Sequence, residues 1–375
     1  MLSYYMIKDS TLPLVDTNPA FQLFYERIKL FMKRDLKNLS LEEIAQLVAE
    51  VRMEPYRARQ VAQWVFRHHA VSIDEMTSLA KEARGRLSEV ACISTLTLEK
   101  IAASKDGSRK FLFKTADGYG IESVLMPEKT HWTLCISTQI GCALGCRFCY
   151  TGTLGLTRNL SVAEILNQVS AVLKAGQFQE KLPNLVFMGM GEPLLNYENT
   201  IKSLRILLNP WGFNFSHRRI TVSTAGITPA IKQLARDLPV NLAISLNAPD
   251  DETRSFIMPV NKKYPLQNLL AETRSFPIPS RKRITFEYIL IKDVNDAPEQ
   301  AEALARLLKN IPCKINLIPF NEYPSAPFKR PDEKQILAFQ AILHQHNYTA
   351  PVRMSKGSDI VAACGQLGGS INSAQ

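Results

Sequence analysis

From about Trp132 onward, short apolar segments alternate with longer amphipathic stretches. The apolar segments are LVFMG, RITVST, NLAISL, ITFEYILI and KINLIPF, and a helical pattern of about 10 to 20 residues lies between successive segments. Such alternation predicts parallel strands joined by right-handed helical crossovers, in a barrel or an open sheet. In such α/β folds the functional residues lie at the carboxyl ends of the strands. The positions directly after each apolar segment are therefore candidates for a site.

The first third of the chain has helical spacing instead. Ser40 is followed three residues later by Glu43, a capping-box signature that predicts a helix start before the apolar positions Ile44, Leu47 and Val48. Helical spacing continues to about residue 90 and includes the segment PYRARQVAQWVFRHH. We therefore predict a small helical domain ahead of the α/β part.

Between residues 96 and 128 the pattern is that of strands. The segments TLEKIAAS, RKFLFKT and IESVLMP are separated by Asp106-Gly107 and Asp117-Gly118, which are hairpin turn signals. The chain is thus divided into an N-terminal extension (1–38), a helical accessory domain (39–95), a small antiparallel β unit (96–128) and an α/β domain (129–375). The pattern of residues 1–38 does not decide whether they are ordered.

Composition and charge narrow the class of protein. Hydrophobic residues make up 46% and charged residues 21% of the 375 positions, which excludes a disordered or fibrous chain. The net charge of +10 favours nucleic acid as a partner, although a solvated basic surface gives the same balance. We find no apolar run of about 18 residues and no secretory signal at the N-terminus, and therefore expect a cytosolic protein. The candidate phosphate contacts form three clusters: Arg57, Arg59, Arg67, His68 and His69; Arg218 and Arg219; and Arg281, Lys282 and Arg283.

Three of the seven cysteines form the most specific motif. Cys142, Cys146 and Cys149 have the spacing C-x₃-C-x₂-C within GCALGCRFC, directly after the strand candidate TLCIST. Three thiolates on one loop can hold three irons of a cubane cluster and leave the fourth iron without a protein ligand. A zinc site usually has paired C-x₂-C motifs, and the sequence has no second pair. We therefore predict an iron–sulfur cluster with one open iron.

This motif, with an aromatic residue before its last cysteine, resembles that of the radical S-adenosylmethionine (SAM) enzymes. The resemblance implies a partial (β/α)6 barrel, a [4Fe-4S] cluster and SAM, which is cleaved reductively to a 5′-deoxyadenosyl radical. Gly191 and Glu192, in the segment GMGEP, match the family element that contacts the SAM amino group. Ser223 and Ser245, at the ends of later strand candidates, match its SAM-binding positions.

Further motifs narrow the resemblance to the RlmN/Cfr family, the bacterial RNA methyltransferases of adenine carbon 2 and their carbon-8 relatives. The motifs are TLCISTQIGCALGCRFC, FMGMGEPLLN, RRITVSTAG, AISLNAPDDETRSFIMPVNKKYPL, NLIPFN and AACGQL, and the similarity spans about residues 40 to 370. It implies methylation of carbon 2 of one adenine in 23S rRNA and of the adenine 3′ to the anticodon in certain tRNAs. The IESVLMPE context of Glu122 favours carbon 2 over carbon 8.

The family's mechanism assigns roles to three residues of this chain. Cys364 would carry a methyl group, Cys135 would resolve the protein–RNA adduct through a transient disulfide with Cys364, and Glu122 would take the proton from the ring carbon. Because the thiolate is the reactive form of cysteine, we expect lowered pKa values for Cys135 and Cys364. Without the resemblance, Glu122 would be expected to face solvent and Cys364 to be a free thiol near a tail.

The resemblance also implies further SAM contacts at Leu246, Asn247 and Asn321. Where relatives commonly have histidine in Ser-Leu-His-Ala-Pro, this chain has Asn247, which puts any proton-dependent role there in doubt. Cys92 and Cys313 are expected to be packing residues. The partners implied are rRNA, tRNA and a flavodoxin-like or similar electron donor, with a monomeric protein and no membrane. The alternative is a protein that is not an enzyme: an RNA-binding protein in which the cluster is only structural and SAM is not cleaved.

Overall fold

The structure is a computed structural model that describes residues 33–176, 182–277, 283–324 and 326–368. Most of the N-terminal extension, residues 1–32, lies outside the described residues. Its last part belongs to the accessory unit, because Leu36 and Lys37 are buried there. No helix in the described ranges is both long enough and apolar enough to span a membrane.

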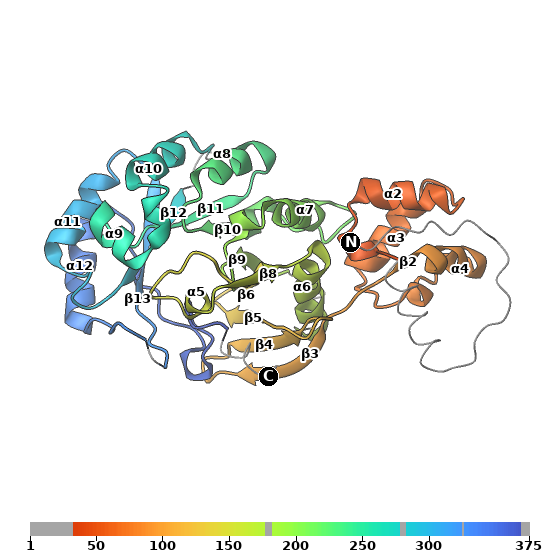
Figure 1. Cartoon of the computed structure of the whole chain (residues 1–375), viewed down its shortest axis with the longest axis horizontal. Helices are drawn as coiled ribbons and strands as arrows, with labels where there is room; N and C mark the ends of the chain where they lie inside the picture. Colours follow the sequence, from red (N-terminus) through yellow and green to blue (C-terminus); the bar gives the residue numbers. More distant parts are fainter. Residues whose placement is uncertain (1–32, 177–181, 278–282, 325, 369–375) are drawn as a thin grey trace, which may run out of the picture.

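The accessory unit lies at one end of the molecule (Figure 1) and consists of three helices and a two-stranded parallel sheet. The predicted capping box is confirmed, since Ser40 and Glu43 exchange hydrogen bonds at the helix start. Leu47, Val61 and Val65 are completely buried and form its core. Its elements are β1 (Arg34–Asp35), η1 (Leu36–Asn38), α2 (Leu41–Glu50), α3 (Arg57–Phe66), η2 (Ile73–Glu75), α4 (Lys81–Val90) and β2 (Ala91–Cys92).

A nine-stranded sheet with the order β13-β12-β11-β10-β9-β6-β5-β4-β3 forms the rest of the fold. Six strands, from β6 to β13 in this order, run parallel, which confirms the partial (β/α)6 barrel. The strands are β3 (Thr97–Ala103), β4 (Arg109–Lys114), β5 (Gly120–Pro127), β6 (Trp132–Cys135), β9 (Asn184–Phe187), β10 (Ile220–Thr224), β11 (Asn241–Ser245), β12 (Ile284–Leu290) and β13 (Cys313–Pro319). All five apolar segments of the sequence pattern are strands.

The longer helices lie along the outside of the curved sheet (Figure 1). They are α6 (Val162–Gly176), α7 (Tyr197–Leu208), α8 (Thr228–Asp237), α10 (Leu266–Ser275), α11 (Pro298–Leu307) and α12 (Glu333–Gln345). The shorter elements are α5 (Tyr150–Thr153), α9 (Asp251–Ile257), the pair β7 (Gln139–Gly141) and β8 (Leu156–Asn159), and the 3-10 turns η3 (Pro193–Leu195), η4 (His217–Arg219), η5 (Pro259–Lys262) and η6 (Ser358–Ile360).

The antiparallel strands β3, β4 and β5 continue the barrel sheet. Val124 and Leu125 of β5 pair with Cys135 and Leu134 of β6, so hydrogen bonding runs unbroken past residue 128. The predicted hairpins are confirmed, and Gly107 and Gly118 have the positive φ values, 85° and 90°, that their turns require.

The register of the strands places a set of polar side chains on one face of the sheet. Residues paired across neighbouring strands point to the same face, and so do residues two apart along a strand. Cys135 pairs with Val186, and Ser245 pairs with Glu287. The side chains that share this inner face are Lys110, Glu122, Cys135, Ser223, Ser245, Glu287 and Asn316.

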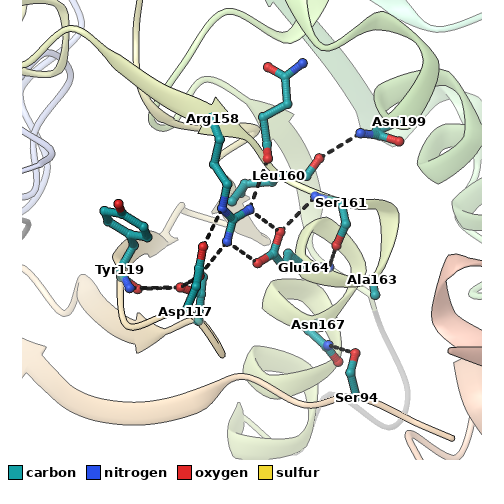
Figure 2. A network of polar contacts seen from close by, with 12 residues as sticks. Ser94, Asp117, Tyr119, Arg158, Leu160, Ser161, Ala163, Glu164, Asn167 and Asn199 are labelled. Atoms are coloured by element: carbon teal, nitrogen blue, oxygen red, sulfur yellow. Dashed lines mark hydrogen bonds and ion pairs between the residues drawn. The ribbon is translucent and has the colours of Figure 1, made fainter. Parts of the chain in front are cut away.

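Arg158 ties the β4–β5 turn to helix α6 (Figure 2). Its guanidinium lies between two carboxylates and donates to Asp117 and to Glu164, with N–O distances of 2.7 to 2.8 Å. Glu164 also accepts from the backbone of Ser161 and caps α6. The second hairpin turn is therefore fixed against the barrel.

We predict a pH-dependent contribution of this ion pair to stability. The hydrogen bonds from Arg158 lower the pKa of Asp117 from 3.8 to about 2. A carboxylate with a lowered folded-state pKa stabilises the fold above its unfolded-state pKa, and that stability is lost as the pH falls. Because Asp117 is half exposed, Asp117→Asn should cost only about 0.5 kcal/mol at neutral pH, and the difference should close as the pH falls from about 4 toward 2. Urea unfolding of both proteins across this range measures it, and a constant difference would contradict the prediction.

Candidate active site

The three motif cysteines lie in the loop between β7 and α5, beside the carboxyl end of β6. Cys142 and Cys146 are buried and Cys149 is partly exposed. The thiols are close enough to affect one another: burial, with a smaller contribution from Cys149, raises the pKa of Cys142 to about 12. Burial also raises the pKa of Cys146, to which both other thiols contribute. The fold thus gathers three thiols that would all be anionic in a metal-bound state.

The donor set fits a cubane cluster better than a single ion. In the described part of the chain, no three Cys, His, Asp or Glu side chains are grouped as ligands of one metal ion. A [4Fe-4S] cluster does not need such convergence, because each thiolate binds a different iron. Three soft sulfur donors that lie near one another, and leave the fourth iron without a protein ligand, fit a [4Fe-4S] cluster.

The GMGEP segment packs directly against the strand that leads to the cysteine loop. Gly191 has φ +95°, and a Cβ there would collide with the side chain of Gln139. Glu192 is buried and accepts from the backbone N–H groups of Leu194 and Ala225. Burial raises its pKa to about 7 despite these hydrogen bonds. A carboxylate buried beside the cluster loop suits an ammonium group as its partner.

Ser223 and Ser245 end neighbouring strands on the inner face and are both partly exposed. Leu246 and Asn247 follow and are completely buried. The amide of Asn247 is used within the protein: its oxygen accepts from the N–H of Ile289 and its nitrogen donates to the sulfur of Met258. Asn247 therefore holds the ends of β11 and β12 together, and its contact with SAM stays a prediction.

The segment that carries Cys364 contacts the start of α5, directly after the three-cysteine loop (residues 142–149). The N–H of Tyr150 donates to Gly365 O at 2.7 Å, and the hydroxyl of Thr151 donates to Leu367 O at 2.7 Å. Asn321 donates through its amide to the carbonyl of Cys364 at 3.0 Å. Asn321 thus contacts the segment itself, and its predicted contact with SAM is untested.

Cys364 contributes to the electrostatic environment of Cys135, although the two are 229 positions apart in the sequence. Both are free thiols in this structure. The Cys364 residue as a whole is exposed, but protein atoms desolvate its thiol and raise the pKa to about 11, with further contributions from Glu287 and Cys149. Burial also raises the pKa of Cys135. In the protein alone, burial and anionic neighbours outweigh the opposing charge of Arg353 on Cys364. The expected lowering concerns thiols beside bound SAM and the cluster, and it stays a prediction.

Glu122 is buried in β5, with 1% exposure, so the expectation of a solvent-facing side chain is wrong. One of its oxygens lies 2.9 Å from Lys110 Nζ and the other accepts from the N–H of Gly368 at 2.7 Å. Both partners are buried or nearly so. Its location next to the Cys364 segment is compatible with the predicted role as a base.

Sequence reasoning missed four polar residues at this site. Lys110 contacts Glu122, Arg254 is completely buried behind the ends of β10 and β11, and Asn316 donates to Glu287 at 2.9 Å on the inner face. Glu287 and Asn316 could have been found, because each is a strongly polar residue flanked on both sides by apolar residues inside a strand segment. Lys110 and Arg254 stand among other charged residues and give no such signal.

The candidate RNA contacts are only partly brought together. Arg59 stacks on the ring of Trp211 at 4.7 Å, and Arg67 donates to the carbonyl of Pro210. His69 is largely buried, and burial lowers its pKa to about 4, which does not suit a phosphate contact. Arg281 and Lys282 lie outside the described residues. The packing role of Cys313 is supported by its burial in β13, whereas Cys92 is only partly buried.

Two family models and several relatives match the chain. Residues 136–318 match the radical SAM superfamily, and residues 34–93 match the ribosomal RNA large subunit methyltransferase N-terminal domain. The dual-specificity RNA methyltransferase RlmN of Syntrophus aciditrophicus is 52% identical over 89% of this chain and 96% of its own length. The RlmN of Geobacter sulfurreducens is 51% identical over 90% of this chain and 93% of its own. The crystal structure of a radical SAM methyltransferase from Sphaerobacter thermophilus has 45% identity and a TM-score of 0.84, and covers 89% of this chain and 98% of that one.

The sheet, the three-cysteine loop and these matches define a radical SAM enzyme, a class that uses a [4Fe-4S] cluster and SAM. Within that class, the chain belongs to the RlmN family of RNA methyltransferases.

Proposed function

We propose that this enzyme methylates carbon 2 of an adenine in 23S rRNA and of the adenine 3′ to the anticodon in certain tRNAs. The observation that carries the proposal is the position of the segment around Cys364. Its residue Gly365 accepts a hydrogen bond from Tyr150, next to the cluster ligand Cys149, and its residues Ala362 and Leu367 pack in one apolar cluster with Cys135. An enzyme that transferred a methyl group directly from SAM would not need a thiol in this place. The names and identities of the relatives support the same substrate class.

The residues divide the work as follows. Cys142, Cys146 and Cys149 would hold the cluster, which would supply the electron that cleaves SAM. Gly191, Glu192, Ser223, Ser245, Leu246, Asn247 and Asn321 would line the SAM site. Cys364 would first take a methyl group from one SAM. The 5′-deoxyadenosyl radical from a second SAM would then remove a hydrogen atom from that methyl group, so that its carbon can bond to carbon 2 of the adenine. Glu122 then takes the proton from carbon 2 of the ring. The unpaired electron of the adduct would be given back to the cluster. Cys135 would then attack the sulfur of Cys364 and break its bond to the transferred carbon, which takes up a proton and becomes the methyl group of the released RNA. The disulfide that remains would be opened by an external reductant.

Nucleotide analysis of treated RNA tests this function. The reconstituted enzyme, with reductant and SAM, should convert one adenine of a 23S rRNA fragment to 2-methyladenosine, identified by mass spectrometry after nuclease digestion. Formation of 8-methyladenosine would instead identify the carbon-8 activity. Loss of the product with Glu122→Gln, when SAM cleavage persists, would support the role of Glu122 as the base.

A different product distinguishes the proposed enzyme from the alternative, an RNA-binding protein whose cluster is only structural. A structural cluster with no turnover would yield no 5′-deoxyadenosine when the anaerobically purified protein is given reductant and SAM. We expect 5′-deoxyadenosine, because the cysteine motif supplies three protein ligands and leaves one iron open to SAM.

We also propose that residues 39–95 act as an RNA-binding accessory domain, with 96–128 and 129–375 forming the catalytic part. Arg57 stacks on Tyr56 and Arg59 stacks on Trp211, and both rings are considerably exposed, at 55% and 37%. An arginine that stacks on one face of an aromatic ring can contact a phosphate, while the other face of that ring stacks with an unpaired base. Helix α3 carries both arginines, and Arg59 and Arg67 contact Trp211 and Pro210, which follow α7 of the barrel domain.

Arg59→Ala should weaken RNA binding without affecting SAM cleavage. We expect a loss of about 1 kcal/mol in binding and a reduced dependence of affinity on salt, since one phosphate contact is removed. Filter binding at several salt concentrations measures both. Arg306→Ala, an exposed arginine on helix α11, is the charge-matched control, and an equal effect of the two variants would contradict a role for this surface.

The electron donor, the oligomeric state and the location in the cell are also part of the proposal. We propose a flavodoxin-like or similar protein as electron donor, a monomeric enzyme and a cytoplasmic location, where rRNA and tRNA are found. The transient disulfide between Cys135 and Cys364 belongs to the same proposal.

A further inference from the structure

The turn between β3 and β4 contacts the segment that leads to Cys364. The N–H of Gly357 donates to Asp106 Oδ2 at 2.9 Å. In return, the hydroxyl of Ser104 and the N–H of Lys105 donate to the carboxylate of Asp359, at 2.6 and 3.1 Å. Each side thus presents one aspartate to donors of the other side. Charge-assisted hydrogen bonds of this kind are stronger than neutral ones.

The turn is organised by its own hydrogen bonds. Asp106 accepts from the N–H of Ser108 at 2.8 Å through its other oxygen, and the N–H of Gly107 donates to Ser104 O at 3.0 Å. One carboxylate therefore both shapes the turn and binds Gly357. On the other side, Gly357 has φ +66°, and a Cβ there would lie 2.9 Å from the Cβ of Ala362, so the segment is also shaped for this contact.

A second set of contacts holds the segment on both sides of Cys364. Lys110 Nζ donates to Val361 O at 3.1 Å while it pairs with Glu122, and Glu122 accepts from the N–H of Gly368. Ala362 and Leu367, which lie in the same segment, pack in a small apolar cluster with Cys135 and Val124. Residues 357–368, the thiol segment, are thus held by the antiparallel strands.

The chain enters the thiol segment from the opposite edge of the sheet. Val352 forms a parallel bridge with Leu317 of β13, and the N–H of Arg353 donates to Leu317 O at 2.8 Å. Gly357, four residues later, is already on the β3–β4 turn. The thiol segment therefore lies across the gap between the two edges of the sheet, and Figure 1 shows the C-terminal chain beside β3 and β4.

We propose that the β3–β4 turn, Ser104–Ser108, is a docking site that positions the thiol segment, with Asp106 as the positioning residue for Cys364. The significance for catalysis rests on the proposed function, in which Cys364 carries the methyl group. A misplacement of a reacting group by about 1 Å can cost on the order of 100-fold in rate. Strands β3 and β4 would then serve the chemistry through the thiol segment, whereas β5 contributes Glu122 directly.

Hydrogen–deuterium exchange of the full-length, cofactor-free protein tests the dock directly. Asp106→Ala should accelerate exchange in a peptide covering residues 357–368 by about tenfold or more, because a charge-assisted hydrogen bond is removed. Asp117→Ala is the matched control, since Asp117 stands in the equivalent Asp-Gly turn of the neighbouring hairpin and binds Arg158 instead. It should leave that peptide unchanged. Unchanged exchange in Asp106→Ala, or equal acceleration in both variants, would overturn the proposal.

A second measurement follows the thiol itself. The rate of Cys364 alkylation by iodoacetamide, measured by mass spectrometry of its peptide, should rise in Asp106→Ala and in Asp359→Ala. The double variant should add little to either single variant, because the two aspartates hold one interface. Additive effects would overturn the dock. If Asp106→Ala does not fold, Gly357→Ala tests the same contact from the other side.

Activity separates this inference from the proposed function. With cluster-loaded enzyme, Asp106→Ala should lower kcat for RNA methylation and leave KM for RNA unchanged. Altered exchange in a protein without methyltransferase activity would support the dock and refute the function. Full activity with Asp106→Ala would refute the positioning role and leave the function intact.

Discussion

Cys364→Ser should abolish RNA methylation, with a loss on the order of 10³-fold or more, as for other variants that lack their nucleophile. A serine hydroxyl at this place is not ionised near neutral pH and does not accept a methyl group as a thiolate does. The contacts of the segment are made by Gly365 O, Leu367 O and the carbonyl of residue 364, so the substitution should leave the fold unchanged. Methylated RNA is measured by mass spectrometry.

Cys92→Ser is the control for the loss of a thiol. Cys92 lies in β2 of the accessory unit, far from the three-cysteine loop in the sequence and only partly buried, so its replacement should change activity less than twofold. Methylation by Cys364→Ser at a tenth of the normal rate or faster would show that the methyl group does not pass through this sulfur.

Arg254→Met should lower both stability and SAM binding. Arg254 is completely buried, and burial lowers its pKa to about 10. Its guanidinium donates to Ala225 O at 2.6 Å, to Ser245 O at 3.1 Å and to Leu246 O at 3.0 Å. Methionine fills the volume but leaves these carbonyls unpaired, which should cost about 3 kcal/mol in the free energy of unfolding. Urea unfolding measures this cost.

The effect on SAM follows from the same contacts. Ser245 and Leu246 are predicted SAM contacts, and Arg254 fixes their carbonyls, so SAM affinity should fall at least tenfold in cluster-loaded protein. Arg254→Lys is the control: it keeps a charge but cannot reach several carbonyls at once, and should recover part of the stability. If both Arg254→Met and Arg254→Lys kept the stability and the SAM affinity of the unchanged protein, the guanidinium of Arg254 would not be needed to position Ser245 and Leu246.

The architecture was predictable because local and global signals agree. The apolar segments that became β9 to β13 are continuous and well separated by helical spacing, and the two Asp-Gly pairs marked both hairpins. The three-cysteine loop was equally clear, because its ligands lie within eight consecutive residues, Cys142 to Cys149. The continuation of the sheet from β5 into β6 was not predictable, since strand partners are decided by packing over long sequence distances.

The finer parts of the site depend on such distant contacts. Glu122 has an ordinary strand environment in the sequence, and only the approach of Lys110 and Gly368 makes it a buried, paired carboxylate. Asn247 has φ +60° and joins two strands, which no spacing pattern reveals. The pKa of Cys364 depends on residues from three separate segments, Glu287, Arg353 and Cys149, which no local pattern brings together.

The contact between Gly368 and Glu122 spans 246 positions and has a consequence for how the enzyme matures. A ribosome makes the chain from its N-terminus, so the strands that receive the thiol exist long before the peptide that carries it. The three-cysteine loop and strand β5 likewise precede the thiol segment in the chain. The hydrogen bond from Gly368 to Glu122 can therefore form only after both have been made, so attachment of the thiol segment is a late event in the folding of a newly made chain.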